Sequence, residues 1–383
     1  MAVPKLRFKE FDNQWDKTTI NDQAQTVTSG SRDWAQYYSE SGDKFIRMTN
    51  LVRDGIYLDL SDLKFVQLPK DSNEGKRTSL KFGDILISIT AELGKLGWIS
   101  EGLGTAYINQ HTALVRMKDS VDSKFVAYSL STEKYNNKLN SLNDSGAKAG
   151  LNLGTIRNFE LIVPPKEEQT KIASFLSAMD EKISQLNQKH ALLSQYKQGM
   201  MQKLFSQQIR FKADDGSEFG EWEEKTIEQI ANFRRGSFPQ PYGLPEWLDS
   251  NGFPFVQVYD VSDKMLLKER TKIKISQLAA DQSVFAKQGT LIITIQGSIG
   301  RIAKMQYDAY VDRTLLIFQS YNCEVDVDYF KYALFLLFNI EKERAEGAII
   351  KTITKETLSK FIVQLPCLEE QTKIANFLSA IDQ

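Results

Sequence analysis

The chain has 383 residues, with 48 basic and 49 acidic side chains and a formal net charge of −1. That balance excludes a histone-like, polybasic protein, although a neutral chain can still carry a local basic face that binds nucleic acid. Two cysteines and two histidines are too few for a disulfide framework, a Cys-rich zinc site or histidine-based metal catalysis.

The first elements expected along the chain are those of a mixed α and β unit. The N-terminal segment contains no apolar stretch, so no signal peptide is expected. Short apolar runs rich in β-branched residues predict strands at 44–51, 83–90 and 106–117, and helical spacing follows at 123–139. In the second half of the chain, the run at 309–319 likewise predicts a strand. The longest apolar run, Tyr332–Phe338, is far shorter than the roughly 20 residues of a membrane span. We therefore expect a soluble, cytoplasmic protein.

A long helix is predicted over 167–205. Pro164 and Pro165 end the preceding strand, and the next two glutamates place negative charge in the first turn, which the helix dipole favours. Seam residues then recur alternately four and three positions apart, which is the period of a coiled coil. The apolar seam consists of Ile172, Leu176, Met179, Ile183, Leu186, Leu193, Met200 and Leu204. His190 and Lys197 also occupy seam positions, where we expect them to set the register or face a partner.

The chain repeats itself. The segment EEQTKIASFLSAMD at 167–180 returns at 369–382 as EEQTKIANFLSAID, with two substitutions. Upstream matches keep the same order at a nearly constant offset: Trp15 with Trp222, GDILISIT with GTLIITIQ, and Gly94–Lys95 with Gly300–Arg301. Chance does not produce such a series, so the chain consists of two copies of a unit of about 200 residues.

The repeat predicts the domain organisation of an α+β protein. Two mixed α/β domains in tandem are expected at 1–163 and 211–365, each followed by a helical segment, at 164–210 and 366–383. Helices that follow equivalent domains naturally pack antiparallel, so we predict an antiparallel coiled coil. The second copy continues the seam with Ile374, Leu378 and Ile381. Its helix has few residues before Gln383, so either the chain is truncated or this helix is short.

Signatures of catalysis are missing from the sequence. It has no Walker A pattern, no G-x-S-x-G, no HExxH and no NPPY-like tetrapeptide of an amino-methyltransferase. No catalytic residue and no metal site are therefore predicted. A duplicated recognition unit joined by long helices favours a binding protein over an enzyme.

Three features together resemble the specificity subunits of type I restriction–modification systems. They are the two P-x-x-EEQ-x-KIA-x-FL segments, the W-x-x-x-x-I openings at Trp15 and Trp222, and the GDIL and GTLI strands. The resemblance covers essentially the whole chain. It implies that each globular domain is a target recognition domain that reads one half of a bipartite, asymmetric site in double-stranded DNA.

The resemblance also implies partners. The helices would form the spacer and dock two modification (methyltransferase) subunits, and restriction/translocase subunits in the full complex. S-adenosylmethionine, ATP and Mg would be bound by those partners, so no cofactor is expected in this chain. Methylation and cleavage would likewise belong to them.

Polar loops that follow equivalent strands are the predicted DNA contacts. Phosphates are bound by Lys, Arg and hydroxyl groups, whereas bases are read by Arg, Asn, Gln or Ser. In the first unit the candidates are Ser29, Ser31, Arg32, Lys76, Arg77, Thr90, Lys95, Lys148 and Asn152. In the second unit they are Arg234, Arg235, Ser237, Gln296, Ser298, Arg301, Lys351, Thr352 and Lys355.

Comparison of the two copies divides these candidates. Lys95 and Arg301 place a basic residue at the same point of both units, which predicts a shared phosphate clamp. Pairs that differ at equivalent points are candidates for reading different bases: Arg32 against Phe238, and Thr90 against Gln296.

Two other hypotheses remain open from the sequence. The chain could be a duplicated scaffold that binds proteins only, or an enzyme with an unrecognised site. Salt-dependent binding to duplex DNA would separate the first from a DNA-binding subunit, because phosphate contacts release counterions. Assays of the isolated chain for methylation and cleavage would test the second.

Overall fold

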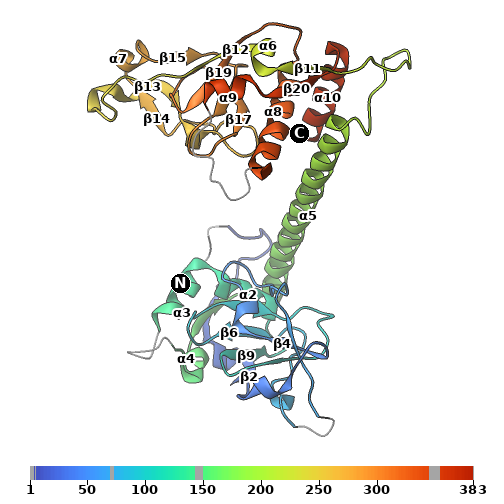
Figure 1. The fold of residues 1–383 in the computed structure, drawn as a ribbon. Coiled ribbons are helices and arrows are strands. Elements are labelled where there is room, and N and C mark those ends of the chain that lie inside the picture. Colours follow the sequence, from blue (N-terminus) through green and yellow to red (C-terminus); the bar gives the residue numbers. More distant parts are fainter. Residues whose placement is uncertain (1–3, 5, 70–72, 143–149, 345–353, 383) are drawn as a thin grey trace. The chain divides into compact units, whose positions relative to one another are not determined.

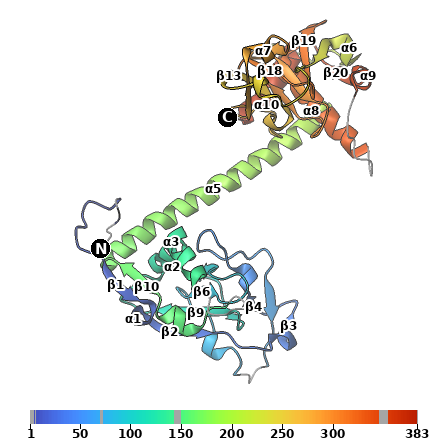
Figure 2. The ribbon, with the colours of Figure 1, turned by 90° about the vertical axis from the view of Figure 1, so that its left-hand side faces the viewer.

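A computed structural model describes residues 4, 6–69, 73–142, 150–344 and 354–382 of the chain. It divides into two compact units, residues 1–186 and 187–383. Helix α5 (Lys166–Phe205) belongs to both, since its first half lies in unit one and its second half in unit two. Figure 1 and Figure 2 show that each unit, taken by itself, combines strands with helices.

Unit one contains two four-stranded sheets and a two-stranded ribbon. One sheet has the order β2 (Ala24–Ser29), β9 (Thr112–Met117), β6 (Ile85–Ser88), β7 (Leu96–Trp98). The other has the order β3 (Tyr38–Ser39), β5 (Lys64–Val66), β4 (Asp43–Ile46), β8 (Ala106–Ile108). The ribbon pairs β1 (Asp16–Thr19) with β10 (Glu160–Val163). The helices are α1 (Ile20–Gln23), α2 (Ser123–Ser131), α3 (Glu133–Ser141) and α4 (Leu153–Arg157), and 3-10 turns lie at Trp34–Tyr37, Met48–Asn50 and Lys76–Thr78.

Unit two has the same inventory of sheets. One sheet has the order β12 (Ala231–Arg235), β19 (Leu315–Tyr321), β16 (Leu291–Thr294), β17 (Ile302–Lys304). The other has the order β14 (Ile273–Ile275), β13 (Leu248–Val256), β18 (Ala309–Val311), β15 (Val284–Ala286). The ribbon pairs β11 (Glu223–Thr226) with β20 (Ile362–Leu365). The helices are α6 (Ile227–Ile230), α7 (Gln277–Ala280), α8 (Val327–Arg344), α9 (Lys355–Ser359) and α10 (Leu368–Ile381), and 3-10 turns lie at Pro245–Trp247 and Val258–Asp260.

The predicted internal repeat is present in the strand pairing. In unit one β6 pairs antiparallel with β9 and β4 pairs parallel with β8; β16 with β19 and β13 with β18 repeat both pairings in unit two. One difference is the fourth strand of the second sheet. It lies beside β5 in unit one (β3) but beside β18 in unit two (β15). The shared framework thus tolerates different edges.

The inner strands β6 and β16 of the first sheets are buried on both faces, which explains their continuous apolar runs. On β6, Ile85 and Ile87 face the cluster formed with α2 and the start of α5, whereas Leu86 faces a separate cluster with Ile46 and Ile108. Alternate residues of a strand point to opposite faces, so a strand covered on both sides needs apolar residues at every position. The predicted strand at 83–90 is thereby confirmed as β6.

Four predicted elements are divided in the structure. The segment 44–51, expected as one strand, forms β4 and then the 3-10 turn Met48–Asn50. The segment 309–319, also expected as one strand, is divided between β18 and β19.

The segment 106–117, expected as one strand, forms β8 and β9 with a polar turn at Asn109–His111 between them. The helical segment 123–139 breaks at Thr132, which joins α2 to α3. Each break occurs at polar residues, which interrupt the apolar pattern of the segment.

The long helix is confirmed, and it extends over 40 residues. Ile172 and Leu176 of the seam pack against the core of unit one, whereas Leu204 is 1% exposed in the core of unit two with Ile374 and Leu378 of α10. The middle of the seam is exposed: Met179, Ile183, Leu186 and Leu193 are all at least 40% exposed. The antiparallel coiled coil therefore stays a prediction.

Among the described residues, no helix is long and apolar enough to cross a membrane.

Candidate functional site

The EEQ motif of unit one anchors the start of α5 to the globular body. The Glu168 side chain is fully buried and accepts two hydrogen bonds of 2.7 Å from the Arg7 guanidinium. Gln169 donates to the Pro164 carbonyl at 2.8 Å and accepts from the Asp122 backbone N–H, at the start of α2, at 3.0 Å. The motif therefore joins three segments by polar contacts in a buried place, where such contacts are strongest.

Unit two repeats the same contacts. Glu370 accepts from Arg210 at 3.1 and 2.7 Å, and the carboxylate raises the pKa of that guanidinium above its ordinary value. Gln371 donates to the Pro366 carbonyl at 2.8 Å and accepts from the Asp326 backbone N–H at 2.9 Å. The repeated motif is thus structural, because it fixes each helix to its own globular body.

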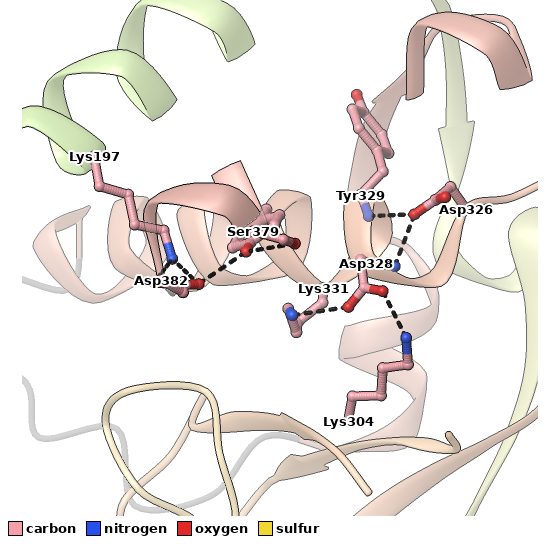
Figure 3. Close-up of polar contacts among 9 residues, drawn as sticks. Lys197, Lys304, Asp326, Asp328, Tyr329, Lys331, Ser379 and Asp382 are labelled. Atoms are coloured by element: carbon pink, nitrogen blue, oxygen red, sulfur yellow. Dashed lines mark hydrogen bonds and ion pairs between the residues drawn. The ribbon is translucent and has the colours of Figure 1, made fainter. Parts of the chain in front are cut away.

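Figure 3 shows a second polar network, where α8, α10 and α5 meet within unit two. Lys197 of α5 contacts both carboxylate oxygens of Asp382, at 2.6 and 2.5 Å, and its ammonium lies 4.8 Å from the Tyr332 ring centroid. The Tyr332 hydroxyl also donates to Asp382 at 3.1 Å. Nearby, Asp328 pairs with Lys304 at 2.5 Å and with Lys331 at 2.9 Å. Lys197, which the sequence placed on the seam, therefore faces the second helix.

In unit one a polar surface forms where β2 ends beside β8. A Cβ on Gly30 would lie 2.1 Å from the Ile108 carbonyl oxygen, so the close approach of the two segments requires glycine. The next residue, Ser31, forms an isolated parallel β-bridge with Asn109. Thr90 meets the same turn, since its hydroxyl lies 2.8 Å from His111 Nδ1. Two segments distant in sequence therefore converge on Asn109–His111.

Unit two builds the equivalent surface with other side chains. A Cβ on Gly236 would lie 2.2 Å from the Val311 carbonyl oxygen. Ser237 donates its backbone N–H to Val311 at 3.0 Å, and the N–H of Ile295, next to Gln296, bonds to the Thr314 carbonyl at 2.9 Å. The Asp312–Thr314 turn is therefore the counterpart of Asn109–His111.

The structure brings some of the predicted DNA-binding residues together. In unit one these are Ser29, Ser31 and Thr90, with Arg77 donating to the Thr28 hydroxyl and, at 3.2 Å, to the Ser29 carbonyl. Arg32 directly follows Ser31 in the sequence. In unit two, Lys355 of α9 lies 5.5 Å from the ring centroid of Phe233 on β12, the strand that carries Arg234 and Arg235.

Other candidates have local roles in the structure. Lys76 pairs with Asn73 at 2.7 Å, Ser237 donates its hydroxyl to the Gln282 carbonyl at 3.0 Å, and the Ser298 carbonyl accepts from Thr294. Asn152 caps α4 by accepting from the Thr155 N–H at 2.8 Å. Lys148, Lys351 and Thr352 lie outside the described residues. DNA contact by any of these residues stays a prediction.

Lys95 and Arg301 do occupy the same position, directly after Gly94 and Gly300 in the β6–β7 and β16–β17 hairpins. Both glycines have φ of 74°, a left-handed conformation that favours glycine. Within each unit, however, the Lys95 ammonium pairs with Glu92, and Arg301 donates to the Val261 carbonyl at 3.1 Å. Hairpin geometry and these internal contacts account for the recurrence, and the phosphate clamp stays a prediction.

Residues of the two turns were not among the predicted contacts. Gln110 and His111 in unit one, and Arg313 in unit two, lay within segments interpreted as continuous strands. The available signal was a run of three polar residues, Asn-Gln-His or Asp-Arg-Thr, at equivalent points of two apolar strands. Such a run interrupts the strand pattern and predicts a turn.

The comparisons with known proteins agree with this architecture. The family model for the type I restriction modification DNA specificity domain matches residues 13–195 and again 220–383. The chain therefore belongs to the family of type I restriction–modification specificity subunits, which recognise DNA.

Individual relatives give the same result. The chain is 25% identical, over 99% of its length and 89% of the relative, to a protein described as the specificity subunit of the type I restriction enzyme MjaX of Methanocaldococcus jannaschii. The S subunit of a type I restriction–modification system from M. genitalium has a similar fold, with a TM-score of 0.66 and 17% identity, over all of this chain and 92% of that one. A chain from a structure of type I R-M complex assembly has a TM-score of 0.53 and 16% identity, over 98% and 91%.

Proposed function

We propose that each unit reads one half of a bipartite, asymmetric site in double-stranded DNA. The observation that carries this proposal is a repeated framework whose converging polar turns differ in sequence, Asn109–His111 in one unit and Asp312–Thr314 in the other. Equivalent positions with different hydrogen-bonding groups recognise different bases, because each base pair presents its own donor and acceptor pattern in the major groove. Since its target would be chromosomal or invading DNA, we infer that the chain works in the cytoplasm.

The middle of α5 supplies the surface on which we place the partners. Its exposed apolar stripe comprises Met179, Ile183, Leu186, Leu192, Leu193 and Tyr196. A helix that exposes a stripe at coiled-coil spacing gains free energy when another helix covers it. We infer that this stripe docks two modification subunits, with restriction/translocase subunits joining in the full complex.

The chemistry would then reside in the partners. They would bind S-adenosylmethionine, ATP and Mg, and they would carry out methylation, translocation and cleavage. The present chain would act as a non-catalytic reader that brings them to the DNA.

Domain exchange followed by methylome sequencing tests the proposal. Residues 1–163 are replaced with the first unit of another family member, and a host expresses this chain with its modification subunit. We expect one half of the methylated site to change and the other half to stay as in the parent. A methylome in which both halves change would show that the units do not read separately.

A second experiment addresses the stripe and the scaffold alternative. Ile183→Lys and Leu186→Lys should abolish co-purification with the modification subunit, whereas Gln188→Lys, on the opposite helix face, should leave it intact. Binding of duplex DNA by the assembled complex should weaken steeply with salt. A complex that assembles normally but shows no DNA affinity at any salt concentration would support the protein-binding scaffold instead.

A further inference from the structure

The two turns identified above differ at their central residue, which is Gln110 in unit one and Arg313 in unit two. We propose that these two side chains read bases, with Gln110 selecting an adenine in one half-site and Arg313 selecting a guanine at the equivalent place of the other. The inference rests on the proposed function, since it requires that each unit contacts its own half-site.

Gln110 has the hydrogen-bonding groups for adenine still available. Its Nε2 lies 3.0 Å from His111 Nε2, and because an amide nitrogen can only donate, the imidazole accepts there. The ring proton is then on Nδ1, which donates to the Thr90 hydroxyl at 2.8 Å. This chain of contacts orients the amide and uses one of its two N–H groups. The second N–H and the amide oxygen match adenine N7 and N6, the pair that glutamine recognises bidentately.

Arg313 is exposed and held by an aromatic ring. Its guanidinium carbon lies 5.3 Å from the ring centroid of Tyr242, within the range of a cation–π contact. The Tyr242 hydroxyl donates to Asp312, and its ring packs on Phe238 with 4.8 Å between centroids. Among the described residues Arg313 has no ion-pair partner. A planar guanidinium positioned in this way can donate two parallel hydrogen bonds to guanine O6 and N7.

The turns themselves are fixed in place. Asn109 Oδ1 accepts from the His111 backbone N–H at 3.1 Å, and Asp312 Oδ1 accepts from the Thr314 N–H at 2.9 Å. With the close glycine contacts beside them, both turns present one central side chain from a defined backbone position. A base reader needs this preorganisation, because a flexible side chain loses affinity on ordering.

The test uses the complex of the full chain with its modification subunit and a library of randomised duplexes. Two variants, Arg313→Gln and Gln110→Arg, are compared with the parent and with Arg270→Gln, which removes an exposed arginine elsewhere in unit two. For Arg313→Gln we expect a preference for guanine to become one for adenine at one position of one half-site, with about 10- to 100-fold discrimination against the wrong base. Gln110→Arg should do the reverse in the other half-site, and Arg270→Gln should leave the consensus unchanged.

Two results would overturn the inference. An unchanged consensus with uniformly weaker binding and a smaller salt slope would make Arg313 a phosphate contact. An unchanged consensus with unchanged affinity would place both turns away from the DNA. Melting temperatures equal to that of the parent establish that the variants fold. Because the parent must itself yield a bipartite consensus, a parent without one would reject the proposed function separately from the inference about the turns.

Discussion

The two units hold their helices with the same motif but support it with different chemistry. At one equivalent place, unit one sets the Lys124 ammonium over the Trp98 ring, 4.2 Å from its centroid. At the equivalent place in unit two, the Asp328 carboxylate pairs with the Lys304 ammonium at 2.5 Å. Both pairs connect the first turn of a helix to the strand beside it. The comparison shows that the same helix–strand contact is made by a cation–π interaction in unit one and by an ion pair in unit two.

A second difference concerns the aspartate that closes each repeated segment. Asp180 in unit one accepts from Tyr128 at 2.6 Å, and among the described residues no lysine joins it. Asp382 in unit two binds both Tyr332 and Lys197, since the end of α5 belongs to the same unit. Unit two therefore contains two helices beside its globular body, whereas unit one contains the first part of α5 alone.

The largest expected effect comes from the buried glutamates. Glu370→Ala would leave Arg210 without its carboxylate and the buried Trp222 indole N–H, which donates to Glu370 at 3.0 Å, without an acceptor. We expect the free energy of unfolding to fall by about 3 kcal/mol, as when one partner of a buried pair is removed.

Unit one offers the matched comparison. Glu168→Ala should lower the free energy of unfolding by less than Glu370→Ala does. The Trp15 indole N–H has no hydrogen-bond acceptor among the described residues, so this substitution removes no tryptophan contact. Exposed Glu369→Ala serves as the control in denaturant unfolding. If Glu168→Ala and Glu370→Ala lowered the free energy of unfolding equally, the Trp222 contact would contribute nothing to stability.

The ion pair of unit two should respond to acid, unlike the cation–π pair of unit one. Burial raises the pKa of Asp328, but the hydrogen bonds from Lys304 and Lys331 outweigh it and hold the pKa below its ordinary value. A carboxyl group with a lowered pKa in the folded state contributes stability at neutral pH, and that contribution is lost as the pH falls through the folded-state pKa.

Asp328→Asn should therefore lower the melting temperature at pH 7, by an amount corresponding to about 1 kcal/mol. The difference from the parent should shrink as melting is repeated toward pH 3. Lys124→Gln in unit one, which removes no carboxylate, should give a difference that does not shrink in the same range. If the melting temperature of Asp328→Asn stayed below that of the parent by the same amount at every pH, the ionised form of Asp328 would not be stabilising.

The smallest effect is expected for the pair between α5 and α10. Lys197 is largely buried but Asp382 is half exposed, so solvent screens their attraction. A double-mutant cycle with Lys197→Ala and Asp382→Asn should give a coupling free energy of about 0.5 kcal/mol. Exposed Lys189, paired in a cycle with the same aspartate variant, should give no coupling. If the Lys197 cycle also gave none, the contact would not help to hold the two helices together.

Local order and repetition were predictable from the sequence. The EEQ segments, the glycine-bounded strands and the heptad spacing of 167–205 are local patterns, and each predicts its element because side-chain periodicity follows backbone geometry. The repeat then predicted two equivalent units, since similar sequences adopt similar folds. Of the candidate surface, the sequence indicated Ser31, Thr90 and Ser237.

What the EEQ motif does was decided only by the tertiary structure. Glu168 and Arg7 are 161 positions apart, so no local pattern could have joined them. The same holds for the contact between Arg301 and the Val261 carbonyl, because these residues are 40 positions apart and the arginine looks like a free charge in the sequence.

The two polar turns show the same limit most clearly. The sequence alone determined that Asn-Gln-His and Asp-Arg-Thr occur at equivalent points of a repeat, but it placed them within strands. Only the structure shows that the chain turns at these residues and that Ser31 and Thr90 lie beside the turn of unit one. The physical reason is that strand pairing joins segments distant along the chain, so which polar side chains share a surface depends on sheet order rather than on sequence spacing.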